Sequence, residues 1–356
     1  MIRRMRVATA GVVIAAVGLG IGLRFRTELR SQWVIVRSML SSTPWHDLRV
    51  CRCWGGRDRT FLRSDGLRIR ASLYGLGSGK PRPGIVLVHG NTPEGRKLPM
   101  YRLLASRLAE SGYVVLAPDQ VGFGESESPF DSGSIEALDN TTEIESSITV
   151  LAGLPEVDSS RIAIIGHSLG AVSGLAAGIR DPRVRALVMI GPPRWMTAKF
   201  ADPRTQEYWW QRYRRQTWQV YHREVPAWLT REAWLRHAAA WDVGNWLPYF
   251  SRPGHKPLLL LDGGLESESE QAWARDFFDR MVPPGKYETA AESNHYLNSV
   301  DLGFHLAVLY DERPVRATVG FIDDWLDDVF ASAQGDSPPA GSVRPRIPVS
   351  GGAATD

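Results

Sequence analysis

The stretch RIAIIGHSLGAVSG, residues 161–174, contains the pattern that decides the fold. Ser168 stands two residues after Gly166 and two residues before Gly170, and a run rich in apolar and β-branched residues precedes it. A strand, then G-x-S-x-G, then a helix predict a sharp turn that holds the serine hydroxyl above a sheet. A capping serine in an ordinary strand-to-helix turn is the alternative, but such a serine would not need both glycines.

The turn is tight, so side chains two positions away on either side of Ser168 would collide with it. The serine lies at a helix N-terminus, where partial positive charge stabilises a developing anion. The backbone N–H of Leu169 is then one donor of an oxyanion hole. A serine placed in this way is expected to transfer acyl groups through a covalent intermediate.

A nucleophilic serine needs a base, and the base needs a carboxylate that orients it. For this kind of turn, the expected order along the chain is serine, acid, histidine. His295 lies in ESNHYLNS (292–299), after the last apolar strand, and is the predicted base. His305 stands within an apolar stretch, so a packing role is expected for it.

The segments around the serine alternate short apolar runs with longer amphipathic ones. Strands are expected over 84–90, 113–119, 161–166, 184–191, 256–263 and 285–291, after a hairpin around Asp65-Gly66. Helices are expected over 98–112, 135–154, 169–180, 269–281 and 314–330. Apolar strands separated by helices predict an α/β fold, with a mostly parallel sheet covered on both faces.

Residues 192–256 lie between two of these strands and hold eight of the thirteen tryptophans of the chain. In TREAWLRHAAAW (230–241), Trp234 and Trp241 fall on one helical face, and Thr230 is the expected N-cap. A helical lid is therefore expected between strands 6 and 7, over the carboxyl ends of the strands, where open α/β sheets bind ligands. The tryptophans could line an acyl pocket, pack the lid onto the body, or touch a bilayer.

Four landmarks occur in a fixed order: VLVHGN (86–91), APDQVGFGES (117–126), GHSLG (166–170) and NHYL (294–297). In this order they resemble the α/β-hydrolase superfamily, over about residues 59–330. The resemblance implies a second oxyanion donor, the backbone N–H of Asn91, with Thr92 as the alternative. It also implies that the loop following Asp119 shapes the site without taking part in catalysis.

The resemblance places the acid of the triad after the seventh strand, commonly as G-x-x-D. Here Gly263-x-x-Glu266 makes Glu266 the first candidate, since either carboxylate can hold the imidazole. Asp262 is the second candidate and Glu268 the third. The expected triad is therefore Ser168, His295 and Glu266.

The expected activity is that of a serine hydrolase that cleaves a carboxylic ester. The expected substrate is a lipophilic small molecule. A peptidase of the same fold, of the amino- or prolyl-peptidase kind, is the nearest alternative. An acyltransferase is the third possible enzyme, and a non-catalytic binding protein is the alternative from another class. No metal or nucleotide motif occurs in the sequence, so no cofactor is expected, and no substrate-binding residue is assigned.

The formal net charge of +3 gives no case for binding nucleic acid. The marked excess of arginine over lysine is typical of a GC-rich bacterial genome. Cys51 and Cys53 are too few for a zinc site, and a disulfide between them would restrain little of the chain. Oligomeric state and compartment do not follow from these features.

Residues 7–23, VATAGVVIAAVGLGIGL, carry no charge and are flanked by arginines. As a helix they span about 26 Å, enough for a bilayer core. A single-pass membrane anchor is therefore expected within residues 1–37, with a cleaved signal or a buried helix as alternatives. The amino-terminal charge favours an extracytoplasmic catalytic domain. The hydrolase domain is expected over 38–332 and a disordered tail over 333–356.

Overall fold

A computed structural model describes residues 56–77, 79–193, 202–221, 224–264, 266, 268–291, 293 and 312–333. All of them belong to one compact unit, formed by residues 53–300 and 311–356. The predicted anchor at 7–23, both cysteines and residues 334–356 of the predicted tail lie outside the described ranges. Within those ranges, none of the helices combines the length and hydropathy that a bilayer crossing requires.

One eight-stranded sheet forms the centre of the fold, in the order β1-β2-β4-β3-β5-β6-β7-β8. The strands are β1 Arg57–Leu62, β2 Arg68–Tyr74, β3 Arg82–Val88, β4 Val114–Pro118, β5 Val157–His167, β6 Val184–Ile190, β7 Leu258–Gly263 and β8 Gly285–Ala290. β2 pairs antiparallel with β1 and with β4, and the strands from β4 across to β8 are parallel. The predicted, mostly parallel sheet is confirmed.

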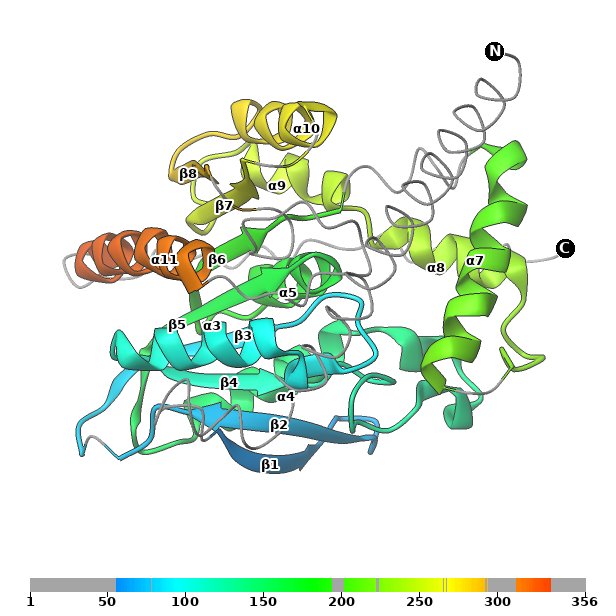
Figure 1. The fold of residues 1–356 in the computed structure, drawn as a ribbon, viewed down its shortest axis with the longest axis horizontal. Coiled ribbons are helices and arrows are strands. Elements are labelled where there is room, and N and C mark those ends of the chain that lie inside the picture. Colours follow the sequence, from blue (N-terminus) through cyan, green and yellow to red (C-terminus); the bar gives the residue numbers. More distant parts are fainter. Residues whose placement is uncertain are drawn as a thin grey trace, which may run out of the picture. The chain divides into compact units, whose positions relative to one another are not determined.

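Helices cover both faces of the sheet (Figure 1). On one face lie α3 Pro99–Glu110 and α11 Glu312–Ala333, which contact each other. The other face packs against α4 Thr141–Ala152, α5 Leu169–Arg180 and α10 Glu268–Asp279, whose buried residues share one apolar core with the strands. Strands buried on both sides explain why β3 to β7 read as nearly continuous apolar runs.

The insert, residues 192–256, contains three α-helices in its described part: α7 Pro203–Tyr221, α8 Arg231–Ala240 and α9 Leu247–Phe250. All three lie between β6 and β7, as the sequence predicts, and α7 and α8 stand at one end of the sheet (Figure 1). Thr230 caps α8, because its side chain accepts a hydrogen bond from the backbone N–H of Ala233 at 3.2 Å. Trp234 and Leu235 pack with Phe130 of the body.

The helix predicted over 135–154 is two elements, which corrects that expectation. The 3₁₀-helix η3 covers Ile135–Leu138, and α4 begins only at Thr141. Asp139 between them has an extended backbone, with φ −74° and ψ 98°. Its carboxylate accepts hydrogen bonds from the backbone N–H and hydroxyl of Thr141 at 2.9 and 2.6 Å. This local side-chain bonding competes with a continuous helix and starts a new one.

Candidate active site

Ser168 occupies the turn between β5 and α5 with φ 52° and ψ −121°. Among the described residues it is the one non-glycine residue with a positive φ. Its backbone N–H donates to the carbonyl of Ile190 at 2.9 Å, and its carbonyl accepts from the N–H of Ala171 at 2.9 Å. Strain of this kind persists only where the surroundings enforce it, and it clusters at functional sites.

The two glycines of the turn are required by space. A Cβ atom on Gly166 would lie 2.3 Å from the carbonyl oxygen of Gly170. One on Gly170 would lie 2.3 Å from the carbonyl oxygen of His89. Both obstacles are backbone atoms, which cannot rotate away, so the predicted clash on either side of the serine is confirmed.

The loop after β3 is hydrogen-bonded to the serine turn through Tyr101 of α3. The Tyr101 hydroxyl accepts from the backbone N–H of Gly90 at 2.7 Å and lies 2.8 Å from Nδ1 of His167, to which it can donate. A Cβ on Gly90 would lie 2.9 Å from Cβ of Ser168, so the loop and the turn are in close contact. Asn91, the predicted second oxyanion donor, follows directly in this loop.

Gln120 fixes His89 at the base of the same loop. Nε2 of His89 accepts from the backbone N–H of Gln120 at 2.9 Å, so Nδ1 carries the proton and donates to the Gly90 carbonyl at 2.6 Å. The side chain of Gln120 donates to the His89 carbonyl at 2.6 Å. Complete burial lowers the pKa of His89, which favours this neutral form.

Asp119 has the structural surroundings that the sequence analysis expects. Its buried carboxylate pairs with the guanidinium of Arg96 and accepts the backbone N–H of Arg96 at 2.7 Å and of Glu125 at 2.9 Å. These bonds hold the loop 119–126 against the segment that precedes α3. It does not line the cavity described next.

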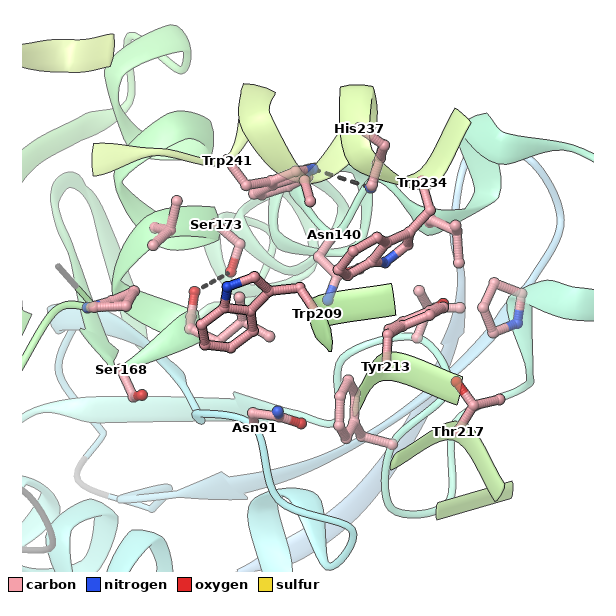
Figure 2. Close-up of a pocket in the computed structure, with 18 of the residues that line it drawn as sticks. Asn91, Asn140, Ser168, Ser173, Trp209, Tyr213, Thr217, Trp234, His237 and Trp241 are labelled. Atoms are coloured by element: carbon pink, nitrogen blue, oxygen red, sulfur yellow. Dashed lines mark hydrogen bonds between the residues drawn. The ribbon is translucent and has the colours of Figure 1, made fainter. Parts of the chain in front are cut away.

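A cavity of about 340 Å³ opens beside Ser168, between the carboxyl ends of the strands and the insert. Ser168, Leu169 and Asn91 line it from the body, so the predicted nucleophile borders the same space as the two residues whose N–H groups are the predicted oxyanion donors. Figure 2 shows Ser168 and Asn91 on one side of this cavity. The insert contributes Trp209, Arg212, Tyr213, Thr217, Trp234, His237, Ala238 and Trp241. No aspartate or glutamate is among the described residues that line it.

The acid candidates lie at the same edge of the sheet as Ser168. The Ser168 N–H bonds to the end of β6, and the N–H of Gly191 donates to Leu261 of β7 at 2.9 Å. Asp262 follows on β7, is buried, and accepts the N–H of Gly263 at 3.0 Å. Glu266 stands in the turn after β7, where its N–H donates to the Gly263 carbonyl at 3.1 Å, and Glu268 begins α10.

The predicted base, His295, lies outside the described residues, as does every residue from 294 to 311. The structure therefore brings together the serine, the predicted oxyanion donors and the sheet edge that carries the acid candidates. The meeting of the three triad side chains stays a prediction.

A polar network on the body side of the cavity was missed by the sequence analysis. Asn140 donates to Oε1 of Gln120 at 3.1 Å, and the hydroxyl of Ser173 donates to the same oxygen at 2.9 Å. Asn140 and Ser173 both line the cavity. The three residues come from a loop, a helix start and α5, so no spacing along the chain brings them together.

His237 of α8 belongs to the insert side of the cavity. Its Nε2 accepts from the indole N–H of Trp241 at 3.0 Å (Figure 2). Its ring also hydrogen-bonds to the backbone of Leu138 in η3. Burial lowers the pKa of His237, against a smaller opposing effect of Asp139 and Glu136. A neutral histidine thus joins α8 to the body.

Comparisons with known proteins agree with this geometry. A family model described as serine aminopeptidase, S33, matches residues 79–243. The 2-hydroxymuconate semialdehyde hydrolase of Pseudomonas sp. (strain CF600) is 35% identical over 124 residues, which are 35% of this chain and 40% of that protein. The chain therefore matches about two fifths of the length of such relatives.

Solved structures resemble the chain over a longer stretch. DcsB in complex with its substrate analogue gives a TM-score of 0.53 at 19% identity, over 77% of this chain and 99% of that one. Est1E from Butyrivibrio proteoclasticus with bound ferulic acid gives 0.52 at 17% identity, over 77% and 99%. At such low identity these likenesses establish the fold.

Proposed function

The chain belongs to the α/β-hydrolase superfamily, and we propose that it is a serine hydrolase that cleaves a carboxylic ester through a covalent acyl-enzyme. The observation that carries the proposal is the strained backbone of Ser168 beside the cavity. A strand-to-helix turn that forces a serine into this conformation, at a helix N-terminus, suits a nucleophile better than a capping residue.

In the proposed reaction, the hydroxyl oxygen of Ser168 attacks the ester carbonyl while His295 takes its proton. The negative charge on the carbonyl oxygen is stabilised by the backbone N–H groups of Leu169 and Asn91. His295 then returns the proton to the departing alcohol. Water next attacks the acyl-enzyme while His295 takes its proton, and His295 returns that proton to Ser168 as the carboxylic acid product leaves. Glu266 holds the imidazole in its reactive tautomer, with Asp262 as the alternative.

A lipophilic small-molecule ester fits the cavity best. Its insert side is mainly aromatic, and none of the described residues that line it is acidic. Burial of apolar acyl surface there would contribute roughly 25 cal/mol per Å² to binding. The expected acyl group is therefore apolar and larger than acetyl.

Rates on matched esters and amides test this proposal. We would measure kcat/KM of the full chain in detergent for 4-nitrophenyl esters of increasing acyl length and for the corresponding anilides. The proposal predicts faster turnover of esters than of anilides, and a rise with acyl length until the cavity is full. Equal rates on short and long acyl groups would count against a lipophilic substrate. Products formed with an added alcohol would indicate an acyltransferase.

A peptidase of the same fold is the second candidate, because the matching family model is described as a serine aminopeptidase. A substrate with a free α-amino group is usually held by a carboxylate, and the described lining of the cavity contains none. Efficient hydrolysis of anilides with no preference for esters would nevertheless favour this candidate. A chain that binds esters without turnover would favour a non-catalytic binding protein.

We also propose that the apolar segment 7–23 anchors the chain in a membrane, on its sequence alone. The anchor would hold the catalytic domain on the extracytoplasmic side, close to lipophilic esters. Resistance of the full chain to carbonate extraction from membranes is the expected result. Extraction into the supernatant would reject the anchor without bearing on the active site.

A further inference from the structure

Three residues of α7 follow one another along the cavity at intervals of four. Trp209, Tyr213 and Thr217 all line it, and residues spaced i, i+4 and i+8 share one face of a helix. At 1.5 Å per residue, the stripe from the first to the third is about 12 Å long. Figure 2 draws Ser168 and Thr217 on opposite sides of the cavity, with Trp209 and Tyr213 between them. Thr217 thus lies at the end remote from the nucleophile.

Thr217 is a polar residue in an unusual setting. It is 2% exposed, and its hydroxyl forms no hydrogen bond with any atom of the described chain. A helical threonine can donate to the carbonyl four residues back, but this one does not. The hydroxyls of Thr217 and Tyr213 lie close enough that Thr217 lowers the pKa of Tyr213, against the larger effect of burial, but the two groups do not meet in hydrogen-bond geometry.

Three other polar side chains that line the cavity have hydrogen-bond partners. Asn140 and Ser173 bond to Gln120, and His237 accepts a hydrogen bond from Trp241. A valine would fill the space of Thr217 equally well without burying an unpaired hydroxyl, which costs stability. A buried unpaired group of this kind calls for a partner that comes from outside the chain.

We propose that Thr217 forms a polar subsite that binds a hydroxyl or carbonyl oxygen at the far end of the substrate's acyl group. This inference rests on the proposed function and narrows its substrate class. The substrate is then an ester whose acyl group is apolar along the Trp209–Tyr213 stretch and carries one hydrogen-bonding group beyond it. A plain fatty acyl ester would leave the Thr217 hydroxyl unpaired and bind less well.

Paired methyl esters test the subsite in the full chain in detergent. The pairs are methyl ω-hydroxyalkanoates and methyl alkanoates with acyl chains of about six to twelve carbon atoms. At the length that reaches Thr217, the hydroxylated ester should have the higher kcat/KM. Thr217→Val should lower the ratio of the two constants about tenfold, and Thr217→Ser should preserve it, because only the serine keeps a hydroxyl. An equal ratio in wild type and Thr217→Val at every length would overturn the proposal.

Binding to the Ser168→Ala chain separates this proposal from the proposed function and requires no Thr217 variant. Tryptophan fluorescence would report the dissociation constants of the same ester pairs. Tighter binding of the hydroxylated ester at one chain length supports the subsite, even if the wild-type chain turns over neither ester. No preference at any length overturns the subsite, even if hydrolysis is fast.

Discussion

At Ser168, backbone strain and the start of α5 act on the same residue. The strain directs the hydroxyl to the cavity, while the helix N-terminus places partial positive charge beside it. Close packing enforces this arrangement, because Gly166, Gly170 and Gly90 each lie where a Cβ would meet a neighbour at 2.9 Å or less. The nucleophile therefore depends on residues that carry no reactive group.

Gly170→Ala tests this dependence. The new Cβ would meet the carbonyl oxygens of His89 and Val88 at 2.3 and 2.4 Å, so the predicted oxyanion loop has to move. We expect the free energy of unfolding to fall by about 1–3 kcal/mol and ester hydrolysis to be lost. Gly153→Ala is the matched control, because its nearest contact would be an ordinary 3.5 Å. Full activity in Gly170→Ala would mean that the turn is far looser than described.

Glu266 and Asp262 are the two main candidates for the acid of the catalytic triad. If Glu266 orients His295, Glu266→Gln should lower kcat about 10³- to 10⁴-fold with little change in KM. Asp262→Asn should have a much smaller effect, since the amide oxygen can still accept the N–H of Gly263. Steady-state kinetics of both variants provide the comparison. The larger loss in Asp262→Asn would transfer the role to Asp262.

At the scale of elements, α8 is held to the body through His237. The ring accepts the indole N–H of Trp241 and hydrogen-bonds to Leu138 of η3, so both ring nitrogens are used while the ring is neutral. A proton on Nε2 would remove the acceptor for Trp241. The bond between His237 and Trp241, at the C-terminal end of α8, is therefore expected to be lost in acid.

The pH dependence of stability tests this contact. Burial holds the pKa of His237 below its ordinary value of about 6.5, so the unfolded chain takes up the proton more readily than the folded chain. The stabilisation is complete above pH 6.5 or so and is lost as the pH falls through the folded pKa. Between pH 7 and 5 the wild-type Tm should fall more steeply than that of His237→Gln, which keeps an acceptor but does not titrate. Parallel Tm profiles would show that the pKa of His237 is the same in the folded and the unfolded chain, which contradicts the expectation.

Some elements of the structure could be predicted from the sequence and others could not. The motif that marks Ser168 spans five residues, so the turn could be predicted directly, although Gly170 is required by a carbonyl of the distant His89 loop. The helix predicted over 135–154 is interrupted at Asp139 by a side-chain bond that apolar periodicity does not register. Tyr101 and Gln120 could not be predicted either, because their partners His167 and His89 reach them only through the order of strands in the sheet. Nor did any pattern single out Thr217.

At the scale of the whole molecule, Arg63 joins parts that are distant in sequence. It follows β1, and its buried guanidinium donates to Glu143 of α4 at 3.0 Å and to the carbonyl of Ala137 at 3.1 Å. The other carboxylate oxygen of Glu143 accepts the N–H of Val121, after β4, at 3.1 Å. One buried ion pair thus ties the β1–β2 hairpin, α4 and the loop beside the cavity.

Arg63→Met should be strongly destabilising, because it leaves the carboxylate of Glu143 buried without its cation. We expect a loss of about 3–5 kcal/mol in the free energy of unfolding, measured by urea titration. Glu143→Gln should cost less, since the amide oxygen can replace one of the two acceptors and Arg63 keeps its ion pair with Asp65. A loss below 1 kcal/mol or so for Arg63→Met would mean that water or a rearranged side chain compensates the charge.

The most direct test of the central claim is labelling of the full chain, in detergent, with a fluorophosphonate, beside the Ser168→Ala variant. Mass spectrometry would locate the adduct, and a thermal unfolding transition would establish that both proteins are folded. One adduct is expected, on Ser168, and none in the variant. A folded wild-type chain that takes up no label, or a variant that is labelled equally, would contradict the assignment of Ser168 as an activated nucleophile.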